Sequence, residues 1–499
     1  MEIEFKFCIP PERLAAVKAA ARRGASTAMR LEARYFDTPD GALASRGIAF
    51  RLRREGKQWI QTVKAMGDGP LDREEHNVPV GGSAPAPRAE LHAGTVAGSR
   101  LHDALQAASG PLAETYRTDV ERVTRDLVFR GGVVELALDT GKIMAYRGTK
   151  QEKQTPVCEL ELELKAGPVA GLVAVATQWA AQYGLVVNTV SKAERGERLM
   201  APQWARPAAK ARPMVKTGST KQFLKGRELQ RAVVANGLAQ ILSNASEIVE
   251  GSSDQEHVHQ LRIGIRRLRT ALRELDGLSP GRFDPGWELP LVEAFRHLGQ
   301  LRDREQILET IGIELREAGA PKSGTPSAAA ATSPLAIVHA PAFQAALIGL
   351  MGFTARDDEP AAMDENTLGA RKSRRLLEKS VHSLQTKIHQ DASRFETLSV
   401  ERQHRVRKRL KRLRYLAGFL EPVLGADADR FLDSLHPALT ALGRLSDEHA
   451  ASAMYAEMAL ADPHAWFGVG WLAGRREFTA RACQEALAQI GAAPRIRRI

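Results

Sequence analysis

Two segments of this chain alternate charged and apolar residues one by one, and this pattern restricts each to a β-strand with two unlike faces. Side chains of a strand point alternately to opposite sides. Residues 2–8 therefore place apolar side chains on one face and, on the other, Glu2, Glu4 and Lys6. Residues 157–165 repeat the design, with leucines opposite Glu159, Glu161 and Glu163. The pattern predicts two strands that each carry a row of carboxylates.

Clustered carboxylates repel one another and are costly to desolvate, so a folded protein holds them together mainly to bind cations. The alternative is a pair of amphipathic strands whose charged faces are solvated. Basic strands of the same design lie between the acidic ones and favour a charged cavity: their faces carry Arg51 with Arg53, Thr62 with Lys64, and Arg73 with Glu75. We expect an antiparallel sheet closed into a barrel, with these faces directed inward.

The combination of acids and bases indicates phosphoryl transfer. Cationic side chains offset the charge of phosphate oxygens, and carboxylates hold the Mg²⁺ or Mn²⁺ that bridges the phosphates. This combination favours a polyphosphate substrate over a single carboxylate or a sugar. We expect direct in-line attack by a water rather than a covalent phospho-enzyme, because no motif supports a nucleophile.

Size and composition point to a multidomain α+β protein in a reducing compartment. The chain has 499 residues, which predicts two or three domains. Its net charge of +12 predicts polyanionic partners, and most of the basic excess lies beyond residue 205. Cys8, Cys158 and Cys483 lack metal-ligand spacing, as expected for free thiols. We find no long apolar run and no signal peptide at the start, so we expect a cytoplasmic protein without a membrane partner.

Near residue 200 the hydrophobic pattern changes from strand-like alternation of polar and apolar residues to helical periodicity. We predict a strand-rich domain over 1–203, a linker over 204–219 and a helical domain over 220–495. A Pro-, Ser- and Ala-rich loop at 320–334 divides the helical domain into parts at about 220–319 and 335–495. These two parts are an internal repeat, because the segment 259–269 recurs at 404–414 and the segment 298–303 recurs at 442–447. We expect an all-α bundle with internal two-fold repetition.

Each copy of the repeat places basic residues along one helix stripe. The spacing i, i+3, i+7 and i+10 holds for His259, Arg262, Arg266 and Arg269, and again for His404, Arg407, Lys411 and Arg414. Arg267 and Arg412 accompany the stripes. A single basic stripe is usually solvated surface, but two in the same register favour a polyanion site. Nucleic acid is the competing ligand, and we disfavour it because the stripes lack interleaved aromatic residues for base stacking.

The first part of the chain resembles the CYTH, or triphosphate tunnel metalloenzyme, family. The motifs that carry the resemblance occur in order over residues 1–200: Glu2-Ile-Glu4-Phe-Lys6, Phe50-Arg51-Leu-Arg53, Thr62-Val-Lys64, Arg73-Glu-Glu75-His-Asn77, Thr118-Asp-Val-Glu-Arg122, Leu136-Ala-Leu-Asp139, Glu159-Leu-Glu161-Leu-Glu163 and Ser191-Lys192-Ala-Glu194-Arg195-Gly196. The match is most similar to bacterial inorganic triphosphatases of that family.

The resemblance implies a barrel that forms a tunnel and a role for each matching residue. Metal ligands would be Glu2, Glu4, Asp139, Glu159 and Glu161. The triphosphate would be bound by Lys6, Arg51, Arg53, Lys64, Arg73, Arg122 and Lys192. Catalytic roles fall to Lys6, Lys64 and Glu163. Asp139 and Glu163 are each assigned either to supporting the metal or to orienting the water.

Residues 220–490 resemble the CHAD family of helical domains, and this resemblance implies binding of inorganic polyphosphate. The signature H-x-x-R-x-x-x-R-R-L-R is complete in the first copy. In the second copy Lys411 stands in place of Arg266, and Ser446 in place of Arg302. A lysine keeps the charge but loses bidentate phosphate geometry, so we expect the second copy to grip less precisely.

Taken together, the sequence predicts metal-dependent hydrolysis of inorganic triphosphate to pyrophosphate and phosphate, joined to polyphosphate binding. The cofactor is expected to be Mg²⁺ or Mn²⁺, and association with polyphosphate granules follows from the partner. Two alternatives stay open: a non-catalytic polyphosphate-binding adaptor, and a triphosphatase or cyclase that acts on ATP or thiamine triphosphate. The sequence does not determine the oligomeric state.

Overall fold

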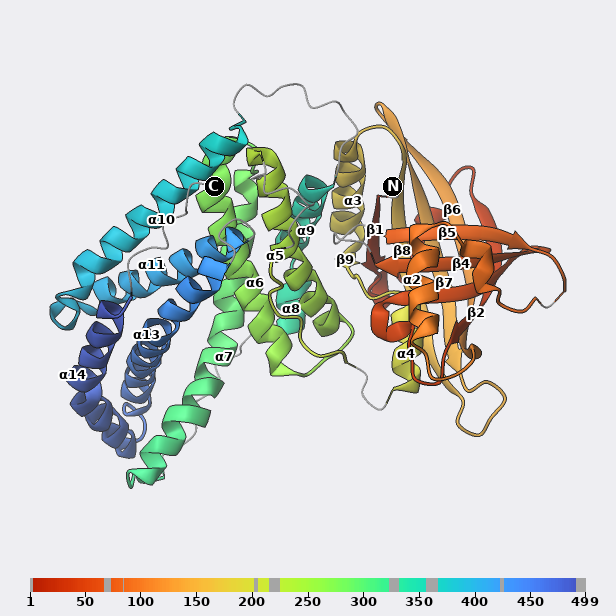
Figure 1. Ribbon diagram of the computed structural model, residues 1–499. Coiled ribbons are helices and arrows are strands. Elements are labelled where there is room, and N and C mark those ends of the chain that lie inside the picture. The colour runs from red at the N-terminus through yellow and green to blue at the C-terminus, as the bar shows by residue number, and fades with distance from the viewer. Residues whose placement is uncertain are drawn as a thin grey trace. The chain divides into compact units, whose positions relative to one another are not determined.

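A computed structural model describes residues 3–66, 73–83, 85–201, 205–214, 225–322, 332–355, 367–421 and 426–490 (Figure 1). The description does not extend to the side chains of Met66, Arg73, residues 300–306 and residues 426–428. Glu2 lies outside the described residues. No helix in the described ranges combines the length and the apolar character that a membrane crossing requires.

The chain divides into two compact units, and each is built from several stretches of sequence. The first unit comprises Met1–Lys210, Leu238–Leu261 and Val338–Pro360. The second comprises Ala211–Gly237, Arg262–Ile337 and Ala361–Ile499. The boundaries that the sequence suggested, at 203, 219 and 495, stay a prediction.

An antiparallel sheet of nine strands forms the body of the first unit. Its strands are β1 (Glu4–Cys8), β2 (Thr27–Asp37), β3 (Ile48–Glu55), β4 (Gln58–Met66), β5 (Arg73–Val80), β6 (Ala113–Phe129), β7 (Gly132–Ala145), β8 (Lys153–Ala166) and β9 (Val186–Val187). Their order is β5-β4-β3-β2-β6-β7-β8-β1-β9. The described ladders leave β5 and β9 as the two edges, so the sheet is open and the predicted closed barrel is not confirmed. The prediction of an antiparallel sheet with flanking helices is confirmed.

The sheet has one apolar face, which three helices cover. The helices are α1 (Leu14–Ala21), α2 (Val96–Gln106) and α3 (Val169–Tyr183). Phe5 and Phe7 of β1 are completely buried on this face, and Phe50 of β3 packs in one cluster with Leu101 of α2. Burial of these large side chains is the main stabilising contribution on this side, about 1.5–3 kcal/mol for each.

A fourth helix, α4 (Lys192–Met200), packs on the opposite, charged face. Ser191 and Glu194 form a capping box that fixes where α4 begins. Leu199 lies in one apolar cluster with Tyr35 of β2 and Tyr116 of β6. Gly196 permits the close approach, because a Cβ added there would overlap the ring of Tyr116. The helix therefore lies directly against the strands that carry the charges.

The remaining long elements are all helices, which confirms the predicted all-helical second half. They are α5 (Gly226–Val249), α6 (Gln255–Leu275), α7 (Glu288–Glu317), α8 (Pro334–Val338), α9 (Pro341–Thr354), α10 (Ala370–Ala392), α11 (Val400–Phe419), α13 (Ala426–Met458) and α14 (Trp466–Ala488). Short 3₁₀ turns lie at Pro11–Arg13, Ala44–Arg46, Ala89–His92, Asp276–Leu278, Pro285–Trp287, Phe395–Thr397 and Pro463–Ala465.

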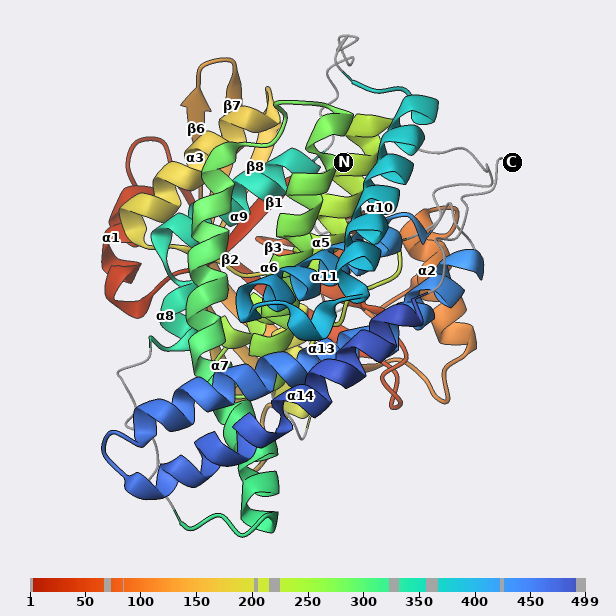
Figure 2. The same ribbon diagram turned by 90° about the vertical axis from the view of Figure 1, so that its left-hand side faces the viewer.

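Helices α10, α11, α13 and α14 pack side by side in the second unit (Figure 2). Their apolar faces meet the beginning of α5 and the end of α6 in one core, in which Leu275, Leu410 and Leu435 are completely buried. Helix α5 takes part in both units: its residues up to Gly237 belong to the second and those from Leu238 belong to the first.

Replacing Gly196 with alanine should destabilise the first unit, because the added methyl group overlaps the ring of Tyr116. We expect a loss of about 1–3 kcal/mol, seen as a lower Tm in thermal unfolding. Gly470→Ala in α14 is the control, since nothing lies within 4 Å of its added Cβ, and helix propensity predicts an equal or higher Tm. An unchanged Tm for Gly196→Ala would contradict the close packing of α4.

Candidate functional site

The registers of the sheet bring acidic and basic residues onto its charged face. Lys6 of β1 lies opposite Glu161 of β8. Glu159 of β8 lies opposite Asp139 of β7, and Asp139 in turn lies opposite Arg122 of β6. Directly opposed residues point to the same side of a sheet. Alternation along four neighbouring strands thus produces one continuous charged surface.

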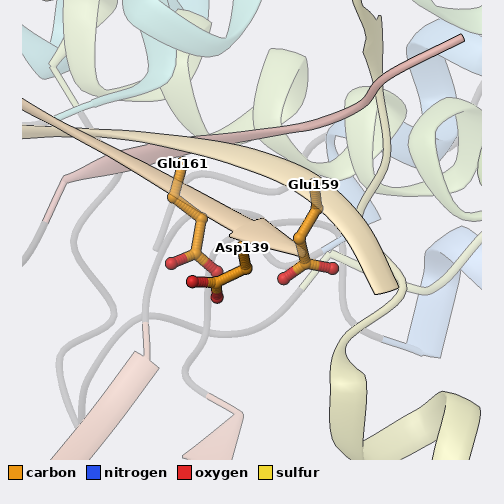
Figure 3. Close-up of side chains that lie close together, drawn as sticks. All are labelled: Asp139, Glu159 and Glu161. Carbon is orange, nitrogen blue, oxygen red and sulfur yellow. The ribbon is translucent and has the colours of Figure 1, made fainter. Parts of the chain in front are cut away.

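Three carboxylates of this surface, Asp139, Glu159 and Glu161, lie together and are termed the acidic trio (Figure 3). Each offers an oxygen, and these atoms all lie within 4.8 Å of one another. Asp139 and Glu159 have 0% exposure. Buried carboxylates at this spacing stay ionised only if positive charge lies among them.

Lys192 and Arg122 supply that positive charge. The Lys192 ammonium lies 2.6 Å from Asp139 Oδ2 and 3.4 Å from Glu161 Oε1, and it also contacts Glu159. Arg122 donates two hydrogen bonds of 2.7 Å to Asp139 and a third of 2.7 Å to Glu161. The ammonium of Lys192 therefore occupies the position that a cation would take among the trio.

The pKa values of Glu161, Asp139 and Lys192 follow from this arrangement. Burial alone would raise the pKa of Glu161, but the positive charges of Lys192, Arg122, Lys6 and Lys64 outweigh it and hold that pKa well below its ordinary range. For Asp139 burial is likewise outweighed, by Lys192 and Arg122, and its pKa is lowered. Burial alone would lower the pKa of Lys192, but the negative charges of Asp139, Glu159 and Glu161 outweigh it and raise that pKa. All three groups are therefore charged at neutral pH.

The contribution of Lys64 to the pKa of Glu161 indicates that the sheet is curved. Lys64 lies on β4 and Glu161 on β8, which are five steps apart in the strand order. In a flat sheet this separation would be about 24 Å, too far for a marked effect on a pKa. The sheet therefore curls, and β3 and β4 form a wall that faces the trio.

This second wall carries Arg51, Arg53 and Lys64, which are termed the basic wall. Lys64 pairs with Glu75 across the β4–β5 hairpin, and Arg53 pairs with Glu55. Arg51 donates to the Tyr35 hydroxyl at 3.3 Å. The Nε atoms of Arg51 and Arg53 are buried and have no hydrogen-bond partner in the described part of the chain. Buried donors without partners are costly, and an anion bound between the walls would satisfy them.

The donor set fits a divalent cation. Carboxylate oxygens are the ligands that Mg²⁺ and Mn²⁺ prefer, and three of them converge here. Glu159 Oε2 is buried and has no hydrogen-bond partner among the described residues, although Arg195 lies 3.4 Å away. An orphaned carboxylate oxygen in such a cluster is a suitable metal ligand.

The structure brings together most of the residues that the sequence assigned to the first site. Lys6 joins the trio, and its ammonium also donates to the carbonyl oxygen of Val190 at 3.4 Å. Glu4 and Glu163 lie opposite each other two residues further along β1 and β8. Glu163 forms a 3.0 Å ion pair with Lys165 and is outside the trio. Glu2 and the Arg73 side chain lie outside the described residues.

Two residues without an assigned role prove to belong to the site. Arg195 lies one helix turn after Lys192 and reaches Glu159. The i, i+3 spacing of these two bases on one helix was the available signal. Glu75 neutralises Lys64, and the hairpin register places them opposite each other. Opposite charge could have suggested the pairs Arg195–Glu159 and Glu75–Lys64 from the sequence, but it could not give their distances.

The second unit gathers four basic residues of the repeated helices, Arg262, Arg266, Arg407 and Lys411, which are termed the basic cluster. Burial lowers the pKa of Lys411 to about 6, helped by the positive charges of Arg266, Arg407 and Arg262 and opposed by Asp447. Arg266 donates to the Tyr415 hydroxyl at 2.8 Å, and Arg407 donates to Ser446 at 2.8 Å. Positive charge therefore dominates this region.

Several other predicted residues of the stripes point away from the basic cluster or pair elsewhere. Arg267 donates to Asn236 at 2.8 Å, Arg269 pairs with Glu288 at 2.7 Å, and Arg412 pairs with Glu274. Arg414 is exposed and His259 is half-buried. The pKa of His404 is lowered, first by partial burial and then by Lys408, Arg407 and Lys411. His404 thus adjoins the basic cluster.

The chain thus combines a curled sheet that carries facing acidic and basic walls with an all-helical region that carries a basic cluster. Comparison with known families agrees with this two-part organisation. The CYTH domain model matches residues 1–196, and the CHAD domain model matches residues 232–456. The chain contains a CYTH domain followed by a CHAD domain, which confirms the resemblances seen in the sequence.

Curated and solved relatives match parts of the chain. The inorganic triphosphatase of Haemophilus influenzae is 30% identical over 173 residues, which are 34% of this chain and 46% of that protein. The match thus spans less than half of that relative. The CHAD domain of Ricinus communis has 20% identity and a TM-score of 0.45, covering 59% of this chain and all of that one. A Hippeastrum putative adenylyl cyclase, reported to have a dominant triphosphatase activity, has 17% identity and a TM-score of 0.30, covering 41% of this chain and 97% of that one.

Replacing Lys192 with methionine should reveal the cation position in the trio. Without the ammonium, the buried carboxylates lose a main partner, and we expect about 3–5 kcal/mol of destabilisation, measured as a fall in Tm in EDTA. Mn²⁺ should then raise the Tm more in Lys192→Met than in the wild type, since the ion takes the vacated position. Lys165→Met is the control and should respond to Mn²⁺ as the wild type does. Equal responses of Lys192→Met and wild type would refute the assignment.

Proposed function

We propose that the curled sheet hydrolyses inorganic triphosphate to pyrophosphate and phosphate with the help of a divalent metal ion. The observation that carries the proposal is the pairing of the acidic trio with a basic wall whose buried Arg51 and Arg53 Nε atoms have no hydrogen-bond partner among the described residues. A chain of phosphates bound to Mg²⁺ or Mn²⁺ would satisfy both walls at once. The CYTH domain and the name of the curated relative support the same reaction.

In this proposal the acidic residues bind the metal ion and the basic residues bind the phosphates. Asp139, Glu159 and Glu161 would hold the metal, and the sequence assigns Glu2 and Glu4 to the same role. The metal supplies positive charge that offsets the phosphate oxygens. Arg51, Arg53 and Lys64 would bind phosphate oxygens from the facing wall, together with Lys6, Arg73 and Arg122. A water between the walls would attack the terminal phosphorus in line with the leaving pyrophosphate, and the bound cations would stabilise the charge on that leaving group.

Lys192 has a double role in this proposal. In the structure its ammonium balances the trio. When the metal enters, the ammonium would leave that position and become available to a phosphate oxygen, which is the role that the sequence suggested. Glu163 would orient the water from its place next to the trio, or serve only to hold Lys165.

We also propose that the basic cluster of the helical unit binds inorganic polyphosphate. The pKa of Lys411 is lowered first by burial and then by the positive charges of Arg266, Arg407 and Arg262, and a bound polyanion would offset those charges. The CHAD domain supports this ligand. Phe295 is already engaged, because the guanidinium of Arg262 lies 5.2 Å from the centre of its ring. This arrangement favours a phosphate chain over a ligand whose bases need ring faces to stack on.

The triphosphatase proposal predicts that the full chain releases phosphate from inorganic triphosphate faster than from ATP or thiamine triphosphate, and only with Mg²⁺ or Mn²⁺. Glu161→Gln should lower kcat/KM at least about tenfold, because it removes a metal ligand. Glu121→Gln is the control, since this half-exposed carboxylate pairs with Arg22 on the other face. Preference for ATP would move the assignment to an organic triphosphate. If none of the three triphosphates releases phosphate, the non-catalytic polyphosphate-binding adaptor becomes the favoured hypothesis.

The polyphosphate proposal predicts that affinity falls as pH rises from 5 to 8. Lys411 is charged below its pKa of about 6 and neutral above it, and a polyanion favours the charged form. The internal phosphates of a long chain stay ionised throughout this range. Lys411→Arg keeps its charge and should show a smaller fall. Binding of labelled polyphosphate at constant ionic strength measures this; identical pH profiles of the two proteins would contradict the role of Lys411.

A further inference from the structure

The helix that carries Lys192 and Arg195 is held by residues from far along the chain. Just before α4, the amide of Thr189 donates to Ser246 Oγ at 2.9 Å, and that of Val187 donates to Gln344 at 2.8 Å. Ser246 lies in α5 and Gln344 in α9. Both belong to the compact unit that contains the sheet, although they fall within the range that the CHAD domain model matches.

Two ion pairs of low solvent exposure join α4 to Glu247 in the last turn of α5 and to Glu250, which directly follows that helix. Arg198 pairs with Glu247 at 2.5 Å, and Arg195 pairs with Glu250 at 3.0 Å. The four side chains are all nearly inaccessible to solvent. The pairs are alike in charge, burial and helix of origin, but they differ in one respect. Only Arg195 also reaches a member of the acidic trio, because it lies 3.4 Å from Glu159.

Arg195 is therefore shared between two carboxylates. Its Nε and Nη2 atoms lie 3.2 Å and 3.0 Å from Glu250 Oε1, closer than its Nη1 lies to Glu159 Oε2. Asn188 donates a further hydrogen bond of 2.6 Å to the same Glu250 oxygen and holds that carboxylate in place. Glu250 thus draws the guanidinium away from Glu159 and balances its charge.

We propose that Glu250 is a positioning residue that keeps Glu159 available to the divalent metal. The inference rests on the proposed function in that it takes the trio as the metal site. With Glu250 ionised, Arg195 orients Glu159 but leaves its Oε2 without a hydrogen bond. Without the negative charge of Glu250, Arg195 interacts more strongly with Glu159 and competes with the metal for that carboxylate. Partners of metal ligands commonly change metal affinity or activity by about 10–100-fold.

Mn²⁺ binding to the full chain without substrate tests this directly. Electron paramagnetic resonance of free Mn²⁺ gives the dissociation constant, and Glu159→Gln provides the value for a damaged site. Glu250→Gln keeps the shape and the contact with Asn188 but loses the charge, and we expect its dissociation constant to rise about tenfold. Glu247→Gln is the matched control: it removes a neighbouring carboxylate, which pairs with Arg198 of the same helix α4, and should lower the Tm without changing Mn²⁺ binding.

Equal Mn²⁺ affinities in Glu250→Gln and Glu247→Gln, or no Mn²⁺ binding in the wild type, would overturn the proposal. If Glu250→Gln does not fold, Glu250→Asp replaces it; this variant keeps the charge and should bind Mn²⁺ more tightly than Glu159→Gln. Phosphate release is measured on the same preparations. A wild type that binds Mn²⁺ through Glu159 yet releases no phosphate would refute the proposed hydrolysis and leave the role of Glu250 standing. If the wild type releases phosphate but Glu250→Gln binds Mn²⁺ as tightly as the wild type, the proposed role of Glu250 is refuted and the proposed hydrolysis stands.

Discussion

Three carboxylates, two of them fully buried and each with one oxygen within 4.8 Å of the others, are the constraint on which the rest of the first unit depends. Such a cluster is stable only with cations among its oxygens. Arg122 comes from the sheet itself, but Lys192 must be delivered by a helix. This requirement explains why α4 packs on the charged face, while α1, α2 and α3 cover the apolar one. The capping box at Ser191 and the missing side chain at Gly196 are the local means of placing it.

The two units treat charge in opposite ways. In the sheet, Lys64, Arg122 and Lys192 each contact a carboxylate, so a ligand at these bases must exchange partners with groups that are already paired. In the helices, Lys411 lies near Arg262, Arg266 and Arg407 with Asp447 as an opposing charge, and a polyanion would add negative charge there. The first arrangement suits a reaction, because released partners can follow the charge as it moves. The second suits retention of a long polyanion, and its strength should depend steeply on salt.

Alternation along the strands was enough to predict which residues share the charged face, because a period of two admits no other assignment. Lys6, Glu159 and Glu161 were assigned in this way, whereas Arg122 and Asp139 were assigned through the resemblance to the CYTH family. The pattern does not encode how far a sheet curls or whether its edges meet, since those depend on packing between distant strands, and the predicted closure was not confirmed. The contact of Arg195 with Glu250 was likewise out of reach, because 55 residues separate the two along the chain.

The division of helix α5 between the two units limits how the two domains can recombine during evolution. Its second half and α9 complete the unit of the sheet, although both lie within the range of the CHAD domain. A gene cut between the two family ranges would leave Arg195 and Arg198 buried without Glu250 and Glu247. Neither domain can therefore be exchanged for a homologous domain independently of the other. Any recombination that gives this sheet a new helical partner must bring acids at matching positions, and substitutions at these four residues should be accepted only in compensating pairs.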